Sequence, residues 1–169
     1  MKLYVDGDDM LEAFRAAGGG VSVEGDAARS RLNLARWLAR YAEHQGCDVD
    51  LVFGGGDPGE VLPPMERHGR VRVSNLGPGQ QVWHEIAGLA NRTAQSERVF
   101  VVTADPRLAQ ALGGGKARAV EPRRFLQRIR AVLRGGRRAE GFDEPDEKFS
   151  GLSDEEVGFW LDFFTGEEQ

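Results

Sequence analysis

Short apolar runs alternate with longer amphipathic stretches over the first 134 residues of the chain. The apolar runs are rich in valine and end at Asp or Gly, a pattern typical of buried strands. The predicted strands cover residues 3–5, 49–53, 69–76, 98–105 and 117–120. The predicted helices cover residues 26–45, 80–94, 106–113 and 122–134. Strands that alternate with helices predict an α/β fold of three layers, with a central parallel sheet of about five strands flanked by helices.

The hydrophobic pattern changes after residue 134. Residues 1–134 are expected to form one domain, and residues 135–150 read as a charged linker. Residues 151–169 predict an acidic amphipathic helix that begins at a capping box formed by Ser153 and Glu156. Its apolar stripe consists of Val157, Trp160, Leu161 and Phe164. We expect this C-terminal helix to dock on the body of the protein or in the groove of a protein partner.

Composition excludes several classes of protein. The chain has 169 residues, of which 40% are hydrophobic and 29% charged. No apolar run approaches the roughly 20 residues that span a bilayer, and the first residues do not resemble a signal peptide, so a cytoplasmic protein is expected. A zinc site is not expected, because the chain has a single cysteine and only three histidines. No Gly-x-Gly-x-x-Gly motif lies between a strand and a helix, so no dinucleotide site is predicted.

Positive charge is concentrated in the body of the chain. Residues 139–169 hold eleven acidic residues and one lysine, whereas residues 1–138 carry a net charge of +5. A basic body makes nucleic acid a candidate partner, and the alternative is a simple solvated arginine face. The candidate RNA-binding residues are Arg67, Arg70, Arg72, Arg124 and Arg128. Phosphate contacts from such residues would weaken steeply with salt.

Carboxylates follow two of the predicted strands at the point where each strand ends. Asp6, Asp8 and Asp9 come directly after the first strand. Asp105 ends the stretch 98–105, the most apolar strand and the one expected at the centre of the sheet. Ligands bind at the carboxyl ends of strands in such sheets, so Asp6 and Asp105 meet if their strands are neighbours. Clustered carboxylates repel one another unless a cation joins them, and oxygen ligands suit Mg²⁺ or Mn²⁺.

Helix capping is the alternative role for some of these acids. Asp8 or Asp9 would cap a helix over residues 10–17, and Asp105 would cap the helix that follows it. Asp6 is less easily explained in this way, because Asp is disfavoured in strands.

Four stretches together resemble a known family. They are residues 4–11 (YVDGDDML), 28–56 (ARSRLNLARWLARYAEHQGCDVDLVFGGG), 77–90 (GPGQQVWHEIAGLA) and 99–112 (VFVVTADPRLAQAL). In order and spacing they resemble the motifs of NYN domains in the PIN-like nuclease superfamily, and most closely those of the bacterial YacP-like branch. The resemblance implies a PIN-like fold and a metal-dependent endoribonuclease that acts on RNA, free or on the ribosome, with Mg²⁺ or Mn²⁺.

The resemblance also implies roles for single residues. Asp6 would be the first metal acid, Asp105 the acid of the Thr-x-Asp motif, and Thr103 a hydrogen-bonding residue within the site. Asp9 stands where the family has Asn and would serve as a metal ligand in its place. Asp8 stands where Tyr is usual and is an accessory residue.

Three positions depart from the family pattern. Gln80 and Gln81 occupy the start of the helix where the family has acids, and Gly54 replaces the acid of a Val-Phe-Asp-Gly strand end. Gln is a weaker ligand for Mg²⁺ than a carboxylate, so these changes favour a degenerate domain that binds RNA or a ribonucleoprotein without cutting. Asp8 and Asp9 would partly compensate by moving negative charge to the first loop.

A second alternative uses the same acids differently. The stretch Asp-Gly-Asp-Asp-Met-Leu also resembles the first motif of HAD-type phosphatases, with Asp6 as nucleophile and Asp8 as general acid and base. The acidic pair that this family places after a later strand is absent here, where Glu121-Pro122-Arg123 follows residues 117–120.

Overall fold

The computed structural model describes residues 1–17, 27–55, 62–113 and 116–133. The predicted cap Asp26, the linker and the C-terminal helix lie outside the described residues. The strands are β1 (Lys2–Asp6), β2 (Asp48–Phe53), β3 (Met65–His68), β4 (Val71–Asn75), β5 (Val99–Val102) and β6 (Ala117–Val120). The helices are α1 (Gly7–Ala16), α2 (Ala27–Gln45), α3 (Val82–Thr93), α4 (Pro106–Ala111) and α5 (Pro122–Leu133). The predicted boundaries agree to within a few residues.

The strands form one six-stranded sheet in the order β3-β4-β2-β1-β5-β6. All neighbouring pairs are parallel except β3 and β4, which are antiparallel. The predicted α/β fold is confirmed, with one strand more than expected. The prediction that residues 98–105 lie at the centre was wrong, because β1 and β2 take that place and β5 lies next to them. The condition for Asp6 and Asp105 to share an edge is met, since β1 and β5 are neighbours.

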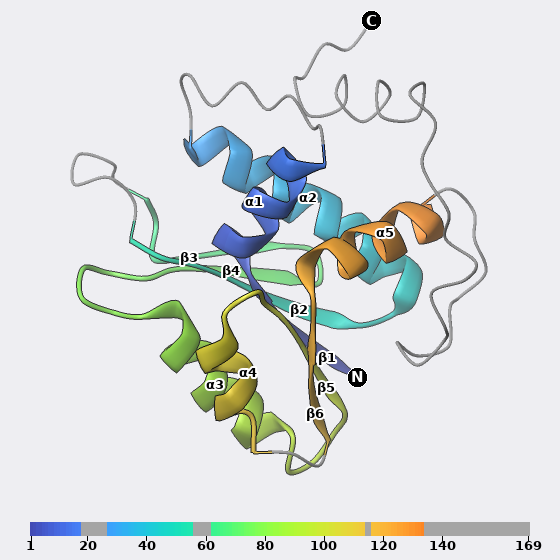
Figure 1. Ribbon diagram of the computed structural model, residues 1–169. Helices are drawn as coiled ribbons and strands as arrows, with labels where there is room; N and C mark the ends of the chain where they lie inside the picture. Colours follow the sequence, from blue (N-terminus) through green and yellow to red (C-terminus); the bar gives the residue numbers. More distant parts are fainter. Residues whose placement is uncertain (18–26, 56–61, 114–115, 134–169) are drawn as a thin grey trace, which may run out of the picture.

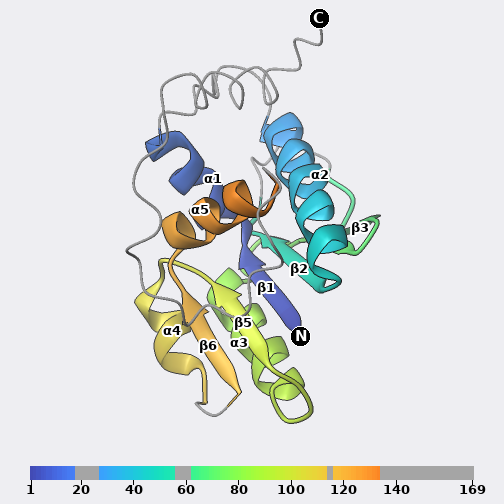
Figure 2. The same cartoon turned by 90° about the vertical axis from the view of Figure 1, so that its right-hand side faces the viewer.

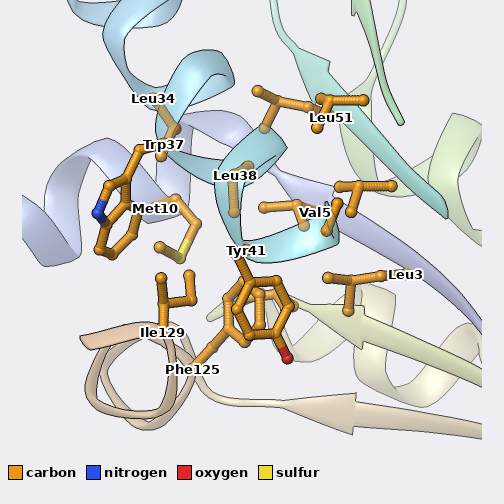
Figure 3. Close-up of a cluster of buried hydrophobic side chains, with 14 of the residues drawn as sticks. Leu3, Val5, Met10, Leu34, Trp37, Leu38, Tyr41, Leu51, Phe125 and Ile129 are labelled. Atoms are coloured by element: carbon orange, nitrogen blue, oxygen red, sulfur yellow. The ribbon is translucent and has the colours of Figure 1, made fainter. Parts of the chain in front are cut away.

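Helices cover both faces of the sheet (Figure 1). Helices α1, α2 and α5 lie on one face and α3 and α4 on the other, as both views show (Figure 2). The larger core lies under α1, α2 and α5, where Leu3 and Val5 of β1 pack with Trp37, Tyr41 and Phe125 (Figure 3). The alternate residue Tyr4 points to the opposite face and packs with α3. Both faces of β1 are therefore buried, as its continuous apolar run predicts.

The unpredicted strand β3 is an edge strand with polar residues. Its sequence is Met-Glu-Arg-His, and its residues are alternately exposed and half-buried. Glu66 and His68 pair with Val73 and Val71 of β4, so they share the face of the sheet that α2 covers. A four-residue polar strand carries no hydrophobic periodicity, and this is why the sequence did not reveal it.

None of the helices in the described part of the chain is long and apolar enough to cross a membrane.

Candidate functional site

Asp6 is the last residue of β1 and the N-cap of α1. Its Oδ1 accepts hydrogen bonds from the backbone N–H groups of Asp8 and Asp9, at 3.1 and 3.2 Å. The prediction that Asp8 or Asp9 caps a helix over 10–17 was wrong, because the helix begins three residues earlier, at Gly7. Gly7 lies so close to β2 that a Cβ added there would be 2.3 Å from Phe53 Cε1. No residue separates β1 from α1, and Asp6 lies at the junction of the two elements.

Asp8 and Asp9 join β1 to its two neighbouring strands. Asp8 Oδ2 accepts a hydrogen bond from the N–H of Gly54, just after β2, at 2.8 Å. Asp9 Oδ2 accepts from Thr103 Oγ1 at 2.9 Å and from the N–H of Ala104 at 2.6 Å, just after β5. Since β1 lies between β2 and β5, the three acids meet at the carboxyl ends of three adjacent strands. This is where ligands bind in open α/β sheets.

Asp6 is the buried acid of this cluster. Its side chain is 6% exposed. Burial raises the pKa of Asp6 to about 7, and the negative charges of Asp9 and Asp8 add to this effect against the two backbone hydrogen bonds. A buried carboxyl with a strongly raised pKa beside other acids is a signature of a functional site. A cation at this position would relieve the repulsion from Asp9 and Asp8 that adds to the effect of burial.

Asp105 lies on the same edge but has different partners. It is the N-cap of α4 and accepts a hydrogen bond from the N–H of Arg107 at 2.8 Å, so the alternative capping role is confirmed. Its Oδ2 also forms an ion pair with Arg107 Nη2 at 2.7 Å. These contacts with Arg107 lower the pKa of Asp105. Sequence reasoning missed Arg107, whose only signal was its position two residues after a candidate acid.

Thr103 connects the two sets of acids. Its hydroxyl donates to Asp9 and accepts from the N–H of Asp105 at 2.9 Å. The side chain is buried, with 6% of its surface exposed. The predicted hydrogen-bonding position of Thr103 agrees with this geometry.

Replacing Thr103 by valine should destabilise the protein by about 2 kcal/mol, because Asp9 loses a donor and the partly buried N–H of Asp105 loses its acceptor. Urea unfolding followed by circular dichroism measures this change. Ser96→Ala, which removes an exposed hydroxyl that donates to the carbonyl of Thr93, is the matched control and should change stability by less. Equal effects of the two substitutions would show that Thr103 does not support the site.

The side chain of Asp8 lies directly beside Gly54. A Cβ added at Gly54 would lie 3.0 Å from Asp8 Oδ2 and 3.6 Å from Val82 Cγ2. The carboxylate of Asp8 therefore lies in the space into which a side chain at position 54 would extend. The same distances place the start of α3, where Val82 is the first residue, beside the acid cluster.

Gln80 and Gln81 lie just before α3. Gln80 Oε1 accepts a hydrogen bond from the N–H of Gly77 at 2.7 Å, which ties it to the preceding loop. Gln81 is the N-cap residue, and its side chain makes no capping hydrogen bond. It accepts instead from the indole N–H of Trp83. Both residues lie at the end of the helix nearest the acids.

The described residues contain no group of three His, Cys, Asp or Glu side chains arranged to hold a metal ion. The chemistry of the donor set is nevertheless that of a magnesium ligand, because carboxylate oxygens suit Mg²⁺. Asp6, Asp8 and Asp9 each bind the protein through one carboxylate oxygen, and within the described residues the other oxygen has no hydrogen bond. Mg²⁺ commonly uses one or two carboxylates and completes its shell with water and substrate phosphate. Asp6 and Asp9 can provide those carboxylates.

The candidate RNA-binding arginines are partly engaged within the protein. Arg70 pairs with Asp48 at 3.0 Å, and Arg72 binds Asp50 through two hydrogen bonds of 2.7 Å each. Arg67 Nε donates to the carbonyl of Gly69. The structure thus places these side chains around β3 and β4, with acids compensating two of them.

The other two arginines lie on α5. Arg128 Nε donates to the hydroxyl of Tyr41 at 3.3 Å. The backbone N–H of Arg124 donates to Glu121 Oε2 at 3.2 Å, so Glu121 caps the start of the helix. The side chains of Arg124 and Arg128 remain RNA-binding candidates by sequence alone.

Comparisons with known proteins agree with this geometry. The family model of the YacP-like NYN domain matches residues 3–155. A mutant form of Rae1 (YacP) from Bacillus subtilis has a similar crystal structure, with a TM-score of 0.63 and 22% identity over 80% of this chain and 77% of that chain. A second crystal structure of the same protein gives a TM-score of 0.61 and 23% identity over 80% and 76% of the two chains. No curated protein matches this sequence significantly.

Proposed function

The chain belongs to the family of YacP-like NYN domains, and we propose from this membership that it is a metal-dependent endoribonuclease that acts in RNA processing or decay. A nuclease domain of the PIN-like kind supports an RNase-type function at the level of the family. The observation that carries the proposal is the meeting of Asp6, Asp8 and Asp9 at the ends of three adjacent strands, with the pKa of Asp6 raised to about 7. Family membership leaves the phosphatase alternative without support.

In this proposal Asp6 and Asp9 hold a Mg²⁺ or Mn²⁺ ion, with Asp105 as a third acid from the next strand. The bound ion would activate water and stabilise the charge that develops on the scissile phosphate. Asp6 is oriented by the two backbone N–H groups at the start of α1, and Asp9 by Thr103 and Ala104. The acids in the first turn of α1 are therefore already oriented in the folded protein, which lowers the entropic cost of assembling the site.

RNA is the proposed substrate, either free or bound to the ribosome, in the cytoplasm. A basic body supports this choice, since residues 1–138 carry a net charge of +5. Arg67, Arg124 and Arg128 are the proposed backbone contacts, together with Arg70 and Arg72 where phosphate competes with Asp48 and Asp50. The C-terminal helix, predicted from residues 151–169, is proposed to dock on the body or on a protein partner.

The test is cleavage of a single-stranded RNA by the purified chain. We expect endonucleolytic products with Mn²⁺ or Mg²⁺ and none with excess EDTA. A DNA oligonucleotide of the same sequence serves as the control substrate. Cleavage that continues in EDTA after metal removal would contradict a metal-dependent mechanism.

A second candidate function is RNA binding without cleavage. It is favoured by Gln80 and Gln81, which stand where the family has acids, and by the lack of a ready three-residue metal group in the described residues. This candidate predicts RNA binding that is independent of metal, and no products with any divalent ion.

Gln81→Asp distinguishes a weakened site from a lost one. An added acid beside the cluster should lower the Mn²⁺ concentration for half-maximal cleavage about tenfold, and Asp is a better N-cap than Gln. Metal titrations of the cleavage rate measure this effect. Gln95→Asp, the same change at an exposed position after α3, is the control. A variant that gains nothing would show that position 81 does not reach the metal.

A further inference from the structure

A pocket of about 470 Å³ lies between α2 and the outer strands β3 and β4. Its lining includes Arg31, Leu32, Pro63, His68, Val73 and Asn75. The volume is within the range of roughly 300–1,000 Å³ that is typical of small-molecule sites. One part of the lining is apolar and another carries hydrogen-bonding groups, which is the composition expected of a ligand site rather than of a packing defect.

Arg31 lies at this pocket and is 9% exposed. Its Nη1 donates to Asn75 Oδ1 at 3.1 Å and its Nη2 to the carbonyl of Gly54 at 3.3 Å. The guanidinium also stands over the ring of Phe53, 4.8 Å from its centroid. These partners hold the side chain in place, but all of them are neutral.

A buried arginine normally has an anionic partner, because desolvation of its charge is costly. Within the residues that the structure describes, no carboxylate forms an ion pair with Arg31. Glu66 also lines the pocket, but it pairs with His68, at 3.3 Å. Arg31 has five N–H donors and uses two of them in hydrogen bonds. The pocket is therefore suited to an anion at Arg31.

The pocket is linked to the acid cluster through one residue, Gly54. Gly54 accepts from Arg31 through its carbonyl and donates its N–H to Asp8. Arg31 and Asp8 thus lie on either side of the same residue at the carboxyl end of β2. A polymer that places one phosphate at the acids can place a neighbouring residue at Arg31.

We propose that this pocket binds one nucleotide unit, with its phosphate on Arg31 and its base against Leu32, Pro63 and Val73. The inference rests on the proposed function where it takes that unit to be an RNA residue next to the cleaved bond. A free nucleoside monophosphate has the same chemistry and is the other source. Asn75 positions Arg31, since it accepts from the guanidinium and donates to the carbonyl of Pro63 at 2.8 Å.

The test measures binding in EDTA, so that no cleavage is involved. A fluorescein-labelled hexaribonucleotide is titrated by anisotropy, and adenosine monophosphate is used as a competitor and as a ligand on its own. Arg31→Gln should weaken oligonucleotide binding about tenfold, because a charged hydrogen-bonding partner of phosphate is lost. Arg36→Gln, the same change at an exposed position of α2, should weaken it much less.

A second variant addresses the risk that Arg31→Gln fails to fold. Ala28 lines the pocket and is half-buried, so Ala28→Phe fills the space and leaves Arg31 in place. It should also weaken binding about tenfold. If adenosine monophosphate neither binds nor competes, and oligonucleotide binding is weakened by Arg31→Gln, the pocket binds an RNA residue. If monophosphate binds alone and depends on Arg31, the pocket serves a free nucleotide.

Oligonucleotide and monophosphate binding that are both unchanged by Ala28→Phe would overturn the pocket proposal. Failure of the proposed function is a separate result. In that case the chain does not cut RNA with any metal, yet binding in EDTA still depends on Arg31. In the converse case, the chain cuts RNA with a metal ion while Ala28→Phe leaves its Michaelis constant unchanged. That result would support the proposed function and contradict the pocket proposal.

Discussion

Asp6→Asn should reduce metal-dependent cleavage of RNA by at least about a thousandfold. Asn is close in shape to Asp and can still accept the backbone hydrogen bonds at the start of α1, so the fold is preserved. What is lost is the charge that would bind the ion at the carboxyl end of β1. The initial rate of RNA cleavage with saturating Mn²⁺ measures the effect. Glu12→Gln, which neutralises an exposed acid of α1, is the control and should leave the rate unchanged.

The same substitution should stabilise the metal-free protein at alkaline pH. Folding raises the pKa of Asp6 from 3.8 to about 7, so the folded state holds a proton that the unfolded state has released. The contribution to stability is complete below pH 4 and is lost as the pH rises through 7. The loss is at most about 4 kcal/mol, from 1.36 kcal/mol for each pKa unit.

Asp6→Asn removes this pH dependence. In EDTA, the variant should therefore exceed the wild type in free energy of unfolding at pH 8 by about 2–4 kcal/mol, and the difference should shrink at pH 5. Urea unfolding at the two pH values measures both differences. A variant that is less stable than the wild type at pH 8 would show that the charge of Asp6 is already compensated in the free protein.

Much of the fold follows from local patterns in the sequence. β1 and β5 are continuous apolar runs because both of their faces are buried, and the acids that follow them are visible as breaks in those runs. The order of the strands is different, since it depends on which buried faces pack together. This is why β5 was expected at the centre, although β1 and β2 lie there.

The candidate acids could be named from the sequence, but their contacts could not. Asp6 and Asp105 were expected at one edge because parallel strands end together, and Asp9 was expected there from the family resemblance. Their partners, however, come from sequence positions far away, such as the hydroxyl of Thr103 for Asp9. The capping role of Asp6 was also missed, because Asp at a strand end and Asp at a helix start look alike when no residue separates the two elements.

The position of Asp8 bears on whether the departures from the family pattern are compensated. The resemblance places an acid at position 54, where this chain has Gly, and a Cβ there would approach Asp8 Oδ2 to 3.0 Å. The carboxylate of Asp8, on α1, thus lies beside the position just after β2. Asp8 can therefore substitute for the acid that the resemblance places at position 54. The acids missing at Gln80 and Gln81 have no such replacement among the described contacts.

Asp105→Asn should also reduce the rate of RNA cleavage about a hundredfold or more, if Asp105 is the third metal acid. Asn is as good an N-cap as Asp, so α4 should remain intact. The pKa of Asp105 is lowered by Arg107, so this carboxylate is charged at all pH values where Asp6 titrates. Its availability to an ion is therefore limited by Arg107 and not by a proton.

Arg107→Gln provides the complementary result. Arg107 is well exposed and holds Asp105 through a 2.7 Å ion pair, while its guanidinium also lies 5.7 Å from the ring centroid of Trp83. Removing it should free Asp105 and lower the Mn²⁺ concentration for half-maximal cleavage several-fold, since an exposed pair is weakly held. Loss of cleavage in Asp105→Asn together with this gain in Arg107→Gln would identify Asp105 as a ligand that Arg107 restrains. Full activity of Asp105→Asn would instead limit Asp105 to capping α4, and the metal would then depend on the acids of the first turn of α1 alone.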